Sequence, residues 1–241
     1  MKATRKEHDF LGELEIPNEV YYGVQTFRAI ENFNITGIPI SKEPLFIKAL
    51  GYVKKAAAMA NKDCGVLDAK IAEAICYGSD QLIAGKFDQE FVSDLIQGGA
   101  GTSVNMNANE VIANIGLEFL GHKKGEYQYL HPNNHVNCSQ STNDAYPSAF
   151  RIALYLKMES FLTTLEELEK AFTAKGREFS KVLKMGRTQL QDAVPMTLGQ
   201  EFHAYATTIG EDIKRLKEAQ SLVLEINMGA TAIGTKVNAP E

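Results

Sequence analysis

Two stretches of apolar residues at helical spacing constrain the fold of this chain more than any other feature. Between residues 146 and 174 the apolar positions step by four and three in turn, through Leu154, Met158, Phe161, Leu165, Leu168 and Phe172. A second stretch carries one apolar face made of Leu198, Phe202, Tyr205, Ile209, Leu216 and Val223. This spacing predicts two long helices, joined by a loop over residues 186–195. Two antiparallel helices cannot enclose a core alone, so the chain is predicted to form part of a larger helical bundle.

The residues before these helices indicate a smaller domain of mixed structure. Prolines and glycines interrupt residues 1–40, which are predicted to form irregular structure and short strands. Apolar residues from Phe46 to Ala60 follow helical spacing, and Asp68 is the predicted N-cap of the next helix. A third helix is expected to begin near Thr102. The polar stretch 121–137 interrupts the pattern, so we predict one domain over residues 1–140 and a helical-bundle domain over residues 141–241.

Composition argues against several classes of protein. The net charge of −5 disfavours nucleic acid as a partner, because phosphate binding needs clustered Lys and Arg. The sequence has no apolar run of 18 residues and no apolar signal-peptide core near its first residue, so no membrane association is expected. Three widely spaced cysteines fit a reducing compartment. We therefore expect a cytoplasmic globular protein.

Three polar segments precede helical stretches and have the same chemical character. They cover residues 98–107, 139–147 and 184–201, and the first contains glycines that allow close approach of the backbone. Short hydroxyl and amide groups at the start of a helix can bind an anion and stabilise charge on a carboxylate oxygen. The short donors of these segments include Thr102, Ser103, Ser141, Thr142, Asn143 and Thr188, and we predict that the three segments form one composite site for a carboxylate.

Each of these segments also allows a structural interpretation. Ser141 and the three residues after it could simply cap a helix. The asparagines at positions 105, 107 and 109 are poor helix formers, which indicates either a functional site or a buried amide network. Arg187 could bind an anion, but we expect it to anchor its turn by hydrogen bonds to carbonyl groups.

The sequence offers no other recognisable catalytic site. His131 and His135 are separated by Pro-Asn-Asn and lack an evident third ligand, so no metal site is expected. No Ser-His-Asp or Cys-His set can be assembled, and no Gly-Lys-Ser/Thr sequence follows the glycines to make a phosphate loop. Composition and spacing alone predict a helical protein with an anion site.

Longer strings of sequence resemble the aspartase/fumarase superfamily, and within it the aspartase branch most closely. The resemblance covers all 241 residues and includes Tyr21–Thr26, Arg28–Asn32, Lys54–Asn61, Gly125–Leu130 and Asn227–Thr235. It implies a homotetramer with one central helical bundle, whose active sites are each built from three subunits. It also implies that Thr102, Ser141, Thr142, Asn143 and Thr188 line the substrate pocket, and we predict that Gln189, next to Thr188, binds the substrate with them.

The resemblance implies a lyase that converts L-aspartate to fumarate and ammonia, a step of amino-acid metabolism. Fumarases and some aspartases have His where this chain has Gln189, so the alternative of fumarate hydratase is disfavoured. The family's Gly-Ser-Ser loop, which carries the serine base and a carboxylate-binding lysine, occurs nowhere in this sequence. We therefore expect an N-terminal half without the catalytic base, inactive alone. A helical oligomerisation module without catalytic activity is the other alternative. No cofactor is expected to be required, and activation by a divalent cation such as Mg²⁺ is left open.

Overall fold

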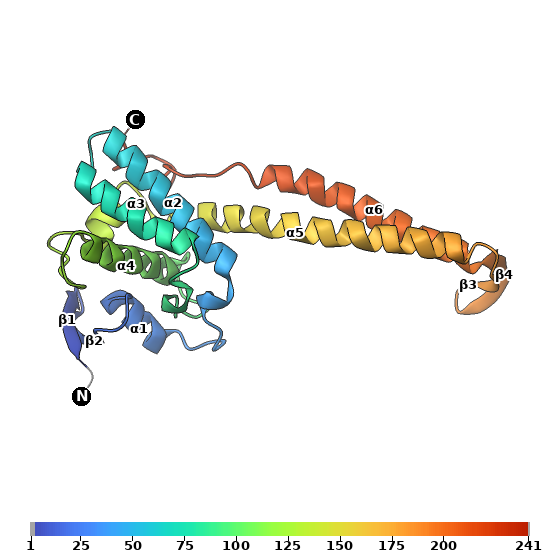
Figure 1. The fold of residues 1–241 in the computed structure, drawn as a ribbon, viewed down its shortest axis with the longest axis horizontal. Helices are drawn as coiled ribbons and strands as arrows, with labels where there is room; N and C mark the ends of the chain where they lie inside the picture. Colours follow the sequence, from blue (N-terminus) through green and yellow to red (C-terminus); the bar gives the residue numbers. More distant parts are fainter. Residues whose placement is uncertain (1–2, 241) are drawn as a thin grey trace. The chain divides into compact units, whose positions relative to one another are not determined.

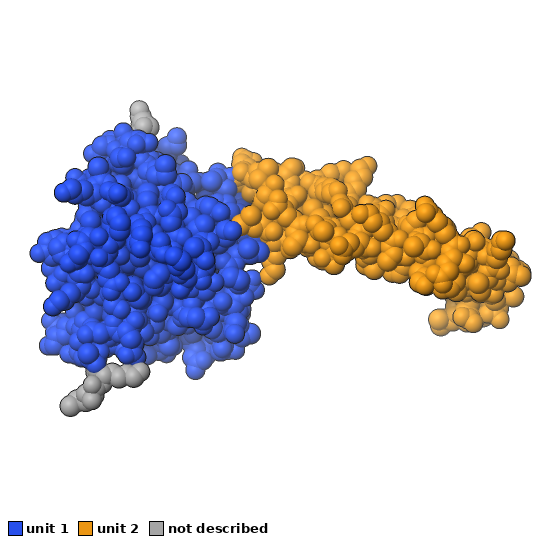
Figure 2. Space-filling view, viewed as in Figure 1, with its two compact units in different colours: residues 1–153, 226–241 blue, residues 154–225 orange. Residues whose placement is uncertain are grey.

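Helices dominate the fold, as the apolar periodicity predicts (Figure 1). The computed structural model describes residues 3–240. They form two compact units, of which the first contains the described residues up to 153 and from 226 onward, and the second contains residues 154–225 (Figure 2). The expected mainly α class with a small mixed N-terminal part is confirmed. The predicted domain boundary at residue 140 stays a prediction, because the compactness of this chain alone does not test it.

The first unit combines a β-hairpin with a layer of packed helices. Its elements are β1 (Thr4–Asp9), β2 (Gly12–Pro17), α1 (Val24–Asn32), the 3-10 turn η1 (Ile40–Lys42), α2 (Pro44–Asp63), α3 (Ala69–Ile83), the 3-10 turn η2 (Asp88–Glu90), α4 (Thr102–Phe119) and the π turn η3 (Pro132–Val136). Strands β1 and β2 pair antiparallel, with Thr4 opposite Pro17 and Asp9 opposite Gly12.

The core of the first unit lies between α2, α3 and α4. Leu50, Ile75 and Ile112, one from each helix, are fully buried. A Cβ atom at Gly78 would lie 2.9 Å from the carbonyl oxygen of Ile112, so glycine at this position lets α3 and α4 approach closely. Asp68 caps α3 as predicted, because its carboxylate accepts hydrogen bonds from the first N–H groups of that helix.

Helix α1 was not predicted, because the residue that caps it is far away in the sequence. Buried Glu110 on α4 accepts the N–H groups of Gly23, Gln25 and Thr26 and the hydroxyl of Thr26. Burial raises the pKa of Glu110 to about 7, and the neighbouring Glu7 adds to the increase, although the Thr26 hydroxyl opposes it. A local search for a capping residue therefore misses the start of α1.

The second unit consists of two long helices and a hairpin. Helix α5 (Thr142–Glu178) begins in the first unit, and is followed by β3 (Leu183–Thr188), β4 (Gln191–Thr197) and α6 (Leu198–Leu222). The helix predicted from residue 146 begins four residues earlier. The loop predicted over residues 186–195 is wrong, because β3 and β4 pair antiparallel there. Gln189 and Leu190 both have positive φ, which suits the two-residue turn of a twisted hairpin.

The apolar faces of α5 and α6 are incompletely buried within this chain. Leu162, Ala206 and Ile213 are the buried apolar residues of the second unit among those described, whereas Phe161 and Tyr205 are about half exposed. This pattern fits the predicted larger bundle. No helix in the described part of the chain is long and apolar enough to span a membrane.

Candidate substrate site

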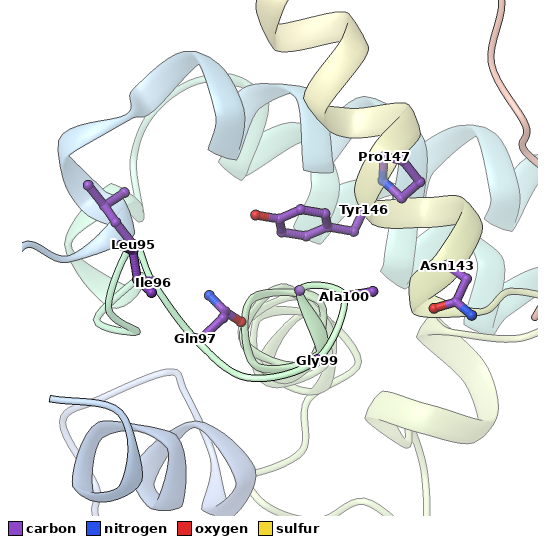
Figure 3. Close-up of a pocket in the computed structure, with 9 residues that line it drawn as sticks. Leu95, Ile96, Gln97, Gly99, Ala100, Asn143, Tyr146 and Pro147 are labelled. Carbon is purple, nitrogen blue, oxygen red and sulfur yellow. The ribbon is translucent and has the colours of Figure 1, made fainter. Parts of the chain in front are cut away.

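A cavity of about 480 Å³ lies at the start of α4, between the loop that leads into this helix and the first turns of α5 (Figure 3). Its lining consists of Leu95, Ile96, Gln97, Gly99, Ala100, Gly101, Asn143, Tyr146 and Pro147. The first two of the three polar segments predicted from the sequence therefore meet at one cavity. The positive end of the α4 dipole adds an electrostatic preference for an anion.

The loop before α4 is held in place by its own hydrogen bonds. The carboxylate of Asp94 accepts N–H groups from Thr36, Gly37 and Ile96. Burial alone would raise the pKa of Asp94, but these hydrogen bonds outweigh it and lower the pKa to about 2. The side chain of Gln97 accepts the N–H of Val104 and so replaces a capping side chain at Gly101.

Gly101 is required by both its backbone conformation and its contact with Tyr146. Its φ is 90°, in the left-handed region that residues other than glycine avoid. A Cβ atom here would overlap the ring of Tyr146, which lies directly against the backbone. The Tyr146 ring also packs edge-to-face on Phe46, with 5.1 Å between ring centroids. Tyr146 therefore forms a rigid wall of the cavity.

A buried amide network lies behind the second polar segment. Lys54 on α2 is fully buried, and its Nζ donates to the side-chain oxygens of Asn105 at 2.7 Å and of Asn137 and Gln140, each at 2.9 Å. Asn105 Nδ2 in turn donates to the Thr142 hydroxyl at 3.0 Å. The network thus connects α2 and α4 with the residues that begin α5.

Lys54 sits at the centre of this network in a strongly desolvated position. Burial lowers the pKa of Lys54 to about 7, and the attraction of Asp144 acts in the opposite direction. Three acceptor oxygens surround Nζ, which matches the three N–H donors of the ammonium form. We conclude that the surrounding oxygens favour the charged form, against the cost of burial.

The structure confirms the capping interpretation of the segment that begins at Ser141. Its hydroxyl accepts the N–H of Asn143 at 3.2 Å, and Asp144 accepts the N–H of Ser141 at 2.9 Å. These two bonds cap the start of α5 in a variant of the capping box, in which the Ser141 hydroxyl accepts the N–H of the second helical residue instead of the third. Capping uses the Ser141 oxygen as an acceptor, which leaves its O–H group as a donor.

The segment after residue 225 returns to this site. Thr231 donates its N–H to buried Asp144 at 2.8 Å, and Asn143 Nδ2 donates to the carbonyl of Ala232 at 2.8 Å. Pro147 has no N–H for the carbonyl of Asn143, and this carbonyl accepts Asn227 Nδ2 instead. The proline within α5 is thereby compensated by a residue from the returning segment.

The predicted site residues divide between the two units. Thr102, Ser141, Thr142 and Asn143 belong to the first unit, where Asn143 lines the cavity and Thr142 contacts the amide network, whereas Thr188 and Gln189 are exposed on the hairpin of the second unit. The convergence of all six stays a prediction. Arg187 does not anchor carbonyl groups among the described residues; its Nε pairs with Asp192 across the hairpin at 3.3 Å.

Three residues of the site were missed by sequence reasoning. Lys54 lies four residues after Leu50 and three before Ala57, on the apolar stripe of its helix. This helical spacing could have identified Lys54 as a buried lysine. Asp144 follows Ser141 by three residues, which is the spacing of a capping box. Tyr146 has no comparable signal, because only its packing on Gly101 reveals its place.

The two histidines considered as a metal pair have structural roles. His131 Nδ1 accepts the N–H groups of Asn133 and Asn134, and His135 Nδ1 accepts the N–H of His131. Burial lowers the pKa of both imidazoles. Within residues 3–240, no group of three or more His, Cys, Asp and Glu side chains is arranged to hold a metal ion.

Comparisons with known proteins agree with the sequence resemblance. A family model described as Lyase matches residues 12–241. Aspartate ammonia-lyase of Pseudomonas fluorescens is 61% identical over 238 residues, and that of Escherichia coli K12 is 54% identical, each covering 98% of this chain and 50% of the relative. The chain therefore spans about half the length of the curated relatives it matches.

Solved structures show the same fold. The crystal structure of a fumarate lyase:delta crystallin from Brucella melitensis bound to cobalt has a TM-score of 0.96 and 54% identity, and covers 99% of this chain and 52% of that one. A class II fumarase from Schistosoma mansoni has a TM-score of 0.92 and 33% identity, and covers 99% of this chain and 50% of that one.

Proposed function

The chain belongs to this lyase family, and from that premise we propose that the whole protein converts L-aspartate to fumarate and ammonia. The observation that carries the proposal is the cavity at the start of α4, where residues 99–101 of the first polar segment meet Asn143, Tyr146 and Pro147 of the second. Relatives that bear the name aspartate ammonia-lyase are 54–61% identical across nearly the whole chain. The cavity supports an anionic substrate, and the names of these relatives support aspartate as that substrate.

The hydroxyl and amide groups suit the stabilising half of this reaction. Removing a proton from the carbon next to a carboxylate builds negative charge on the carboxylate oxygens. Donors such as Thr142 O–H can hydrogen-bond these oxygens more strongly as that charge develops. We propose that Thr102, Ser141, Thr142, Asn143, Thr188 and Gln189 bind the substrate, with the last two supplied by another copy of the chain.

The remaining parts of the mechanism are proposed to lie outside this chain. The described elements offer no serine or histidine placed as a base at the cavity, so the serine base and the carboxylate-binding lysine are assigned to the part of the relatives that this chain does not cover. We further propose a cytoplasmic homotetramer that needs no bound cofactor, with divalent cations such as Mg²⁺ tested as activators. Sedimentation of the whole protein as a monomer at micromolar concentration would contradict the assembly.

Fumarate hydratase is the nearest alternative with the same chemistry. Gln189 stands where a histidine is expected in the hydratase branch, and a glutamine cannot exchange a proton near neutral pH. The solved fumarase is also less similar, at 33% identity. A scaffold without catalytic activity remains the alternative of a different class, and the activity assay separates it from both enzymes.

The test measures fumarate formed by the purified whole protein from L-aspartate and, separately, from L-malate. We expect ammonia release from aspartate and little fumarate from malate. Fumarate from malate at the higher rate would favour the hydratase, and no turnover of either substrate would favour the scaffold. The 241-residue chain alone is expected to be inactive, because losing a positioned base costs a factor on the order of 10² to 10⁴.

A further inference from the structure

We propose that Lys54 is a positioning residue that, through Asn105, fixes the Thr142 hydroxyl as a hydrogen-bond donor toward a substrate carboxylate. The inference deepens the proposed function and rests on it for the identity of the substrate. It concerns a side chain that is fully buried and that contacts no residue of the predicted substrate set directly.

The first step fixes the orientation of the Asn105 amide. The oxygen and nitrogen of an asparagine side chain are assigned from their hydrogen-bond partners. Lys54 can only donate in its ammonium form, so the atom of Asn105 that lies 2.7 Å from Nζ must be the oxygen. The amide nitrogen then faces the opposite side, where it lies 3.0 Å from Thr142 Oγ1 and 3.1 Å from Asn137 Oδ1.

The neighbours of Asn105 hold the same orientation. Asn137 Oδ1 also accepts from Lys54 and from Asn109 Nδ2, so it cannot serve as a donor to Asn105. Gln140 places its oxygen on Lys54 and its nitrogen on the carbonyls of Val136 and Cys138. Asn105, Asn137 and Gln140 therefore all point their oxygens at the lysine, and reversing Asn105 would place two donors against each other.

The second step passes this orientation to Thr142. A hydroxyl group has one proton, and the Thr142 oxygen already accepts from Asn105. Among the described residues, Thr142 Oγ1 has no other hydrogen-bond partner, so its proton remains available to a ligand. A hydroxyl oriented in this way can donate to a carboxylate oxygen. The bond from Asn105 occupies one of the two lone pairs of this oxygen and directs the proton away from the Asn105 amide.

The substitution Asn105→Asp tests this relay with almost no change in shape. The new carboxylate still accepts from Lys54, so the buried lysine keeps a partner, but the carboxylate cannot donate to Thr142. The Thr142 proton is then expected to turn toward it and away from the substrate. In the whole protein, KM for aspartate should rise by about tenfold or more, as expected for losing one hydrogen bond to a charged group.

A double-mutant cycle separates this relay from a general structural effect. Thr142→Val removes the hydroxyl, so Asn105→Asp should then change KM by less than about twofold in the Thr142→Val background. Lys54→Met should raise KM in the wild-type background and leave it unchanged when Thr142 is already replaced. Equal effects of Asn105→Asp in both backgrounds, or no effect in the wild type, would overturn the proposal.

A binding measurement keeps this inference separate from the proposed function. Wild-type protein that fails to turn over aspartate refutes the function, and the same cycle is then measured by calorimetric titration with succinate, a dicarboxylate that cannot eliminate. Weaker succinate binding by Asn105→Asp, in the wild-type background alone, supports the relay. A wild type that binds no dicarboxylate overturns it, because Thr142 then has no carboxylate to meet.

Discussion

Replacing Gly101 by alanine should cost more than the same change two residues earlier, although both glycines have positive φ. Gly99 has a φ of 71° and Gly101 a φ of 90°, so alanine is strained at either position by about 1–2 kcal/mol. The surroundings differ. A Cβ atom at Gly99 would meet only the Thr102 hydroxyl at 3.4 Å, whereas one at Gly101 would overlap the ring carbons of Tyr146.

The ring of Tyr146 cannot easily move away from this clash, because it packs on Phe46. Overpacking of this kind typically costs about 1–3 kcal/mol, and this cost adds to the backbone strain. Gly101→Ala should therefore destabilise by about 2–5 kcal/mol and Gly99→Ala by about 1–2 kcal/mol. Urea unfolding followed by circular dichroism measures both, with Gly99→Ala as the matched control.

A second substitution isolates the contact itself. In a Tyr146→Ala background the ring atoms nearest to the added Cβ are gone, so Gly101→Ala should cost mainly the backbone strain there. The coupling between the two sites should then equal the overpacking cost, about 1–3 kcal/mol. Equal destabilisation by the two glycine substitutions, or a coupling near zero, would show that Tyr146 is not the rigid wall that the structure indicates.

Three further predictions test other contacts. Asp68→Ala should destabilise by about 1 kcal/mol in urea unfolding, because it removes the α3 cap. Since burial raises the pKa of Glu110 from 4.5 to about 7, the folded state binds more protons than the unfolded state between these values. Stability should therefore fall as pH rises through that window, and Glu110→Gln should flatten this part of the profile measured by thermal unfolding. Thr188→Val in the whole protein should reduce the stabilisation of the transition state, measured from kcat/KM for aspartate, by about 3 kcal/mol if Thr188 acts as a charge-stabilising donor. A change in kcat/KM below twofold in steady-state assays would contradict that role.

The parts of the fold that sequence reasoning predicted depend on local signals. The apolar stripe of α5 repeats over several turns, and Asp68 lies directly before the helix it caps. Helix α1 lacked such a signal, because its N–H groups are satisfied by Glu110, more than 80 residues away. The hairpin β3–β4 was missed because Gln189 and Leu190 replace the glycine or asparagine that usually marks a turn with positive φ.

The residues of the site were also difficult to predict where no local sequence signal marks them. Lys54 and Lys55 are adjacent and chemically identical, yet Lys54 is fully buried while Lys55 pairs with Asp80 at 2.7 Å near the surface. In the sequence, only their positions around the helix distinguish the two lysines. A lysine on an apolar stripe is normally treated as an exception to the apolar pattern, so its burial is not predicted. The three asparagines at positions 105, 107 and 109 are all buried, so the structure favours the amide network over direct contact with substrate.

The distribution of free donors and acceptors indicates which ligand this part of the site selects. Asp144 uses its two carboxylate oxygens on the N–H groups of Ser141 and Thr231, and Gln97 uses its oxygen on Val104. The hydroxyl protons of Ser141 and Thr142 remain as donors for a carboxylate. Asn143 donates to Ala232, which leaves its side-chain oxygen, on the cavity side in Figure 3, as an acceptor. Donors for a carboxylate beside one acceptor oxygen are complementary to a carboxylate and an ammonium group, which supports the amino-acid substrate that we propose.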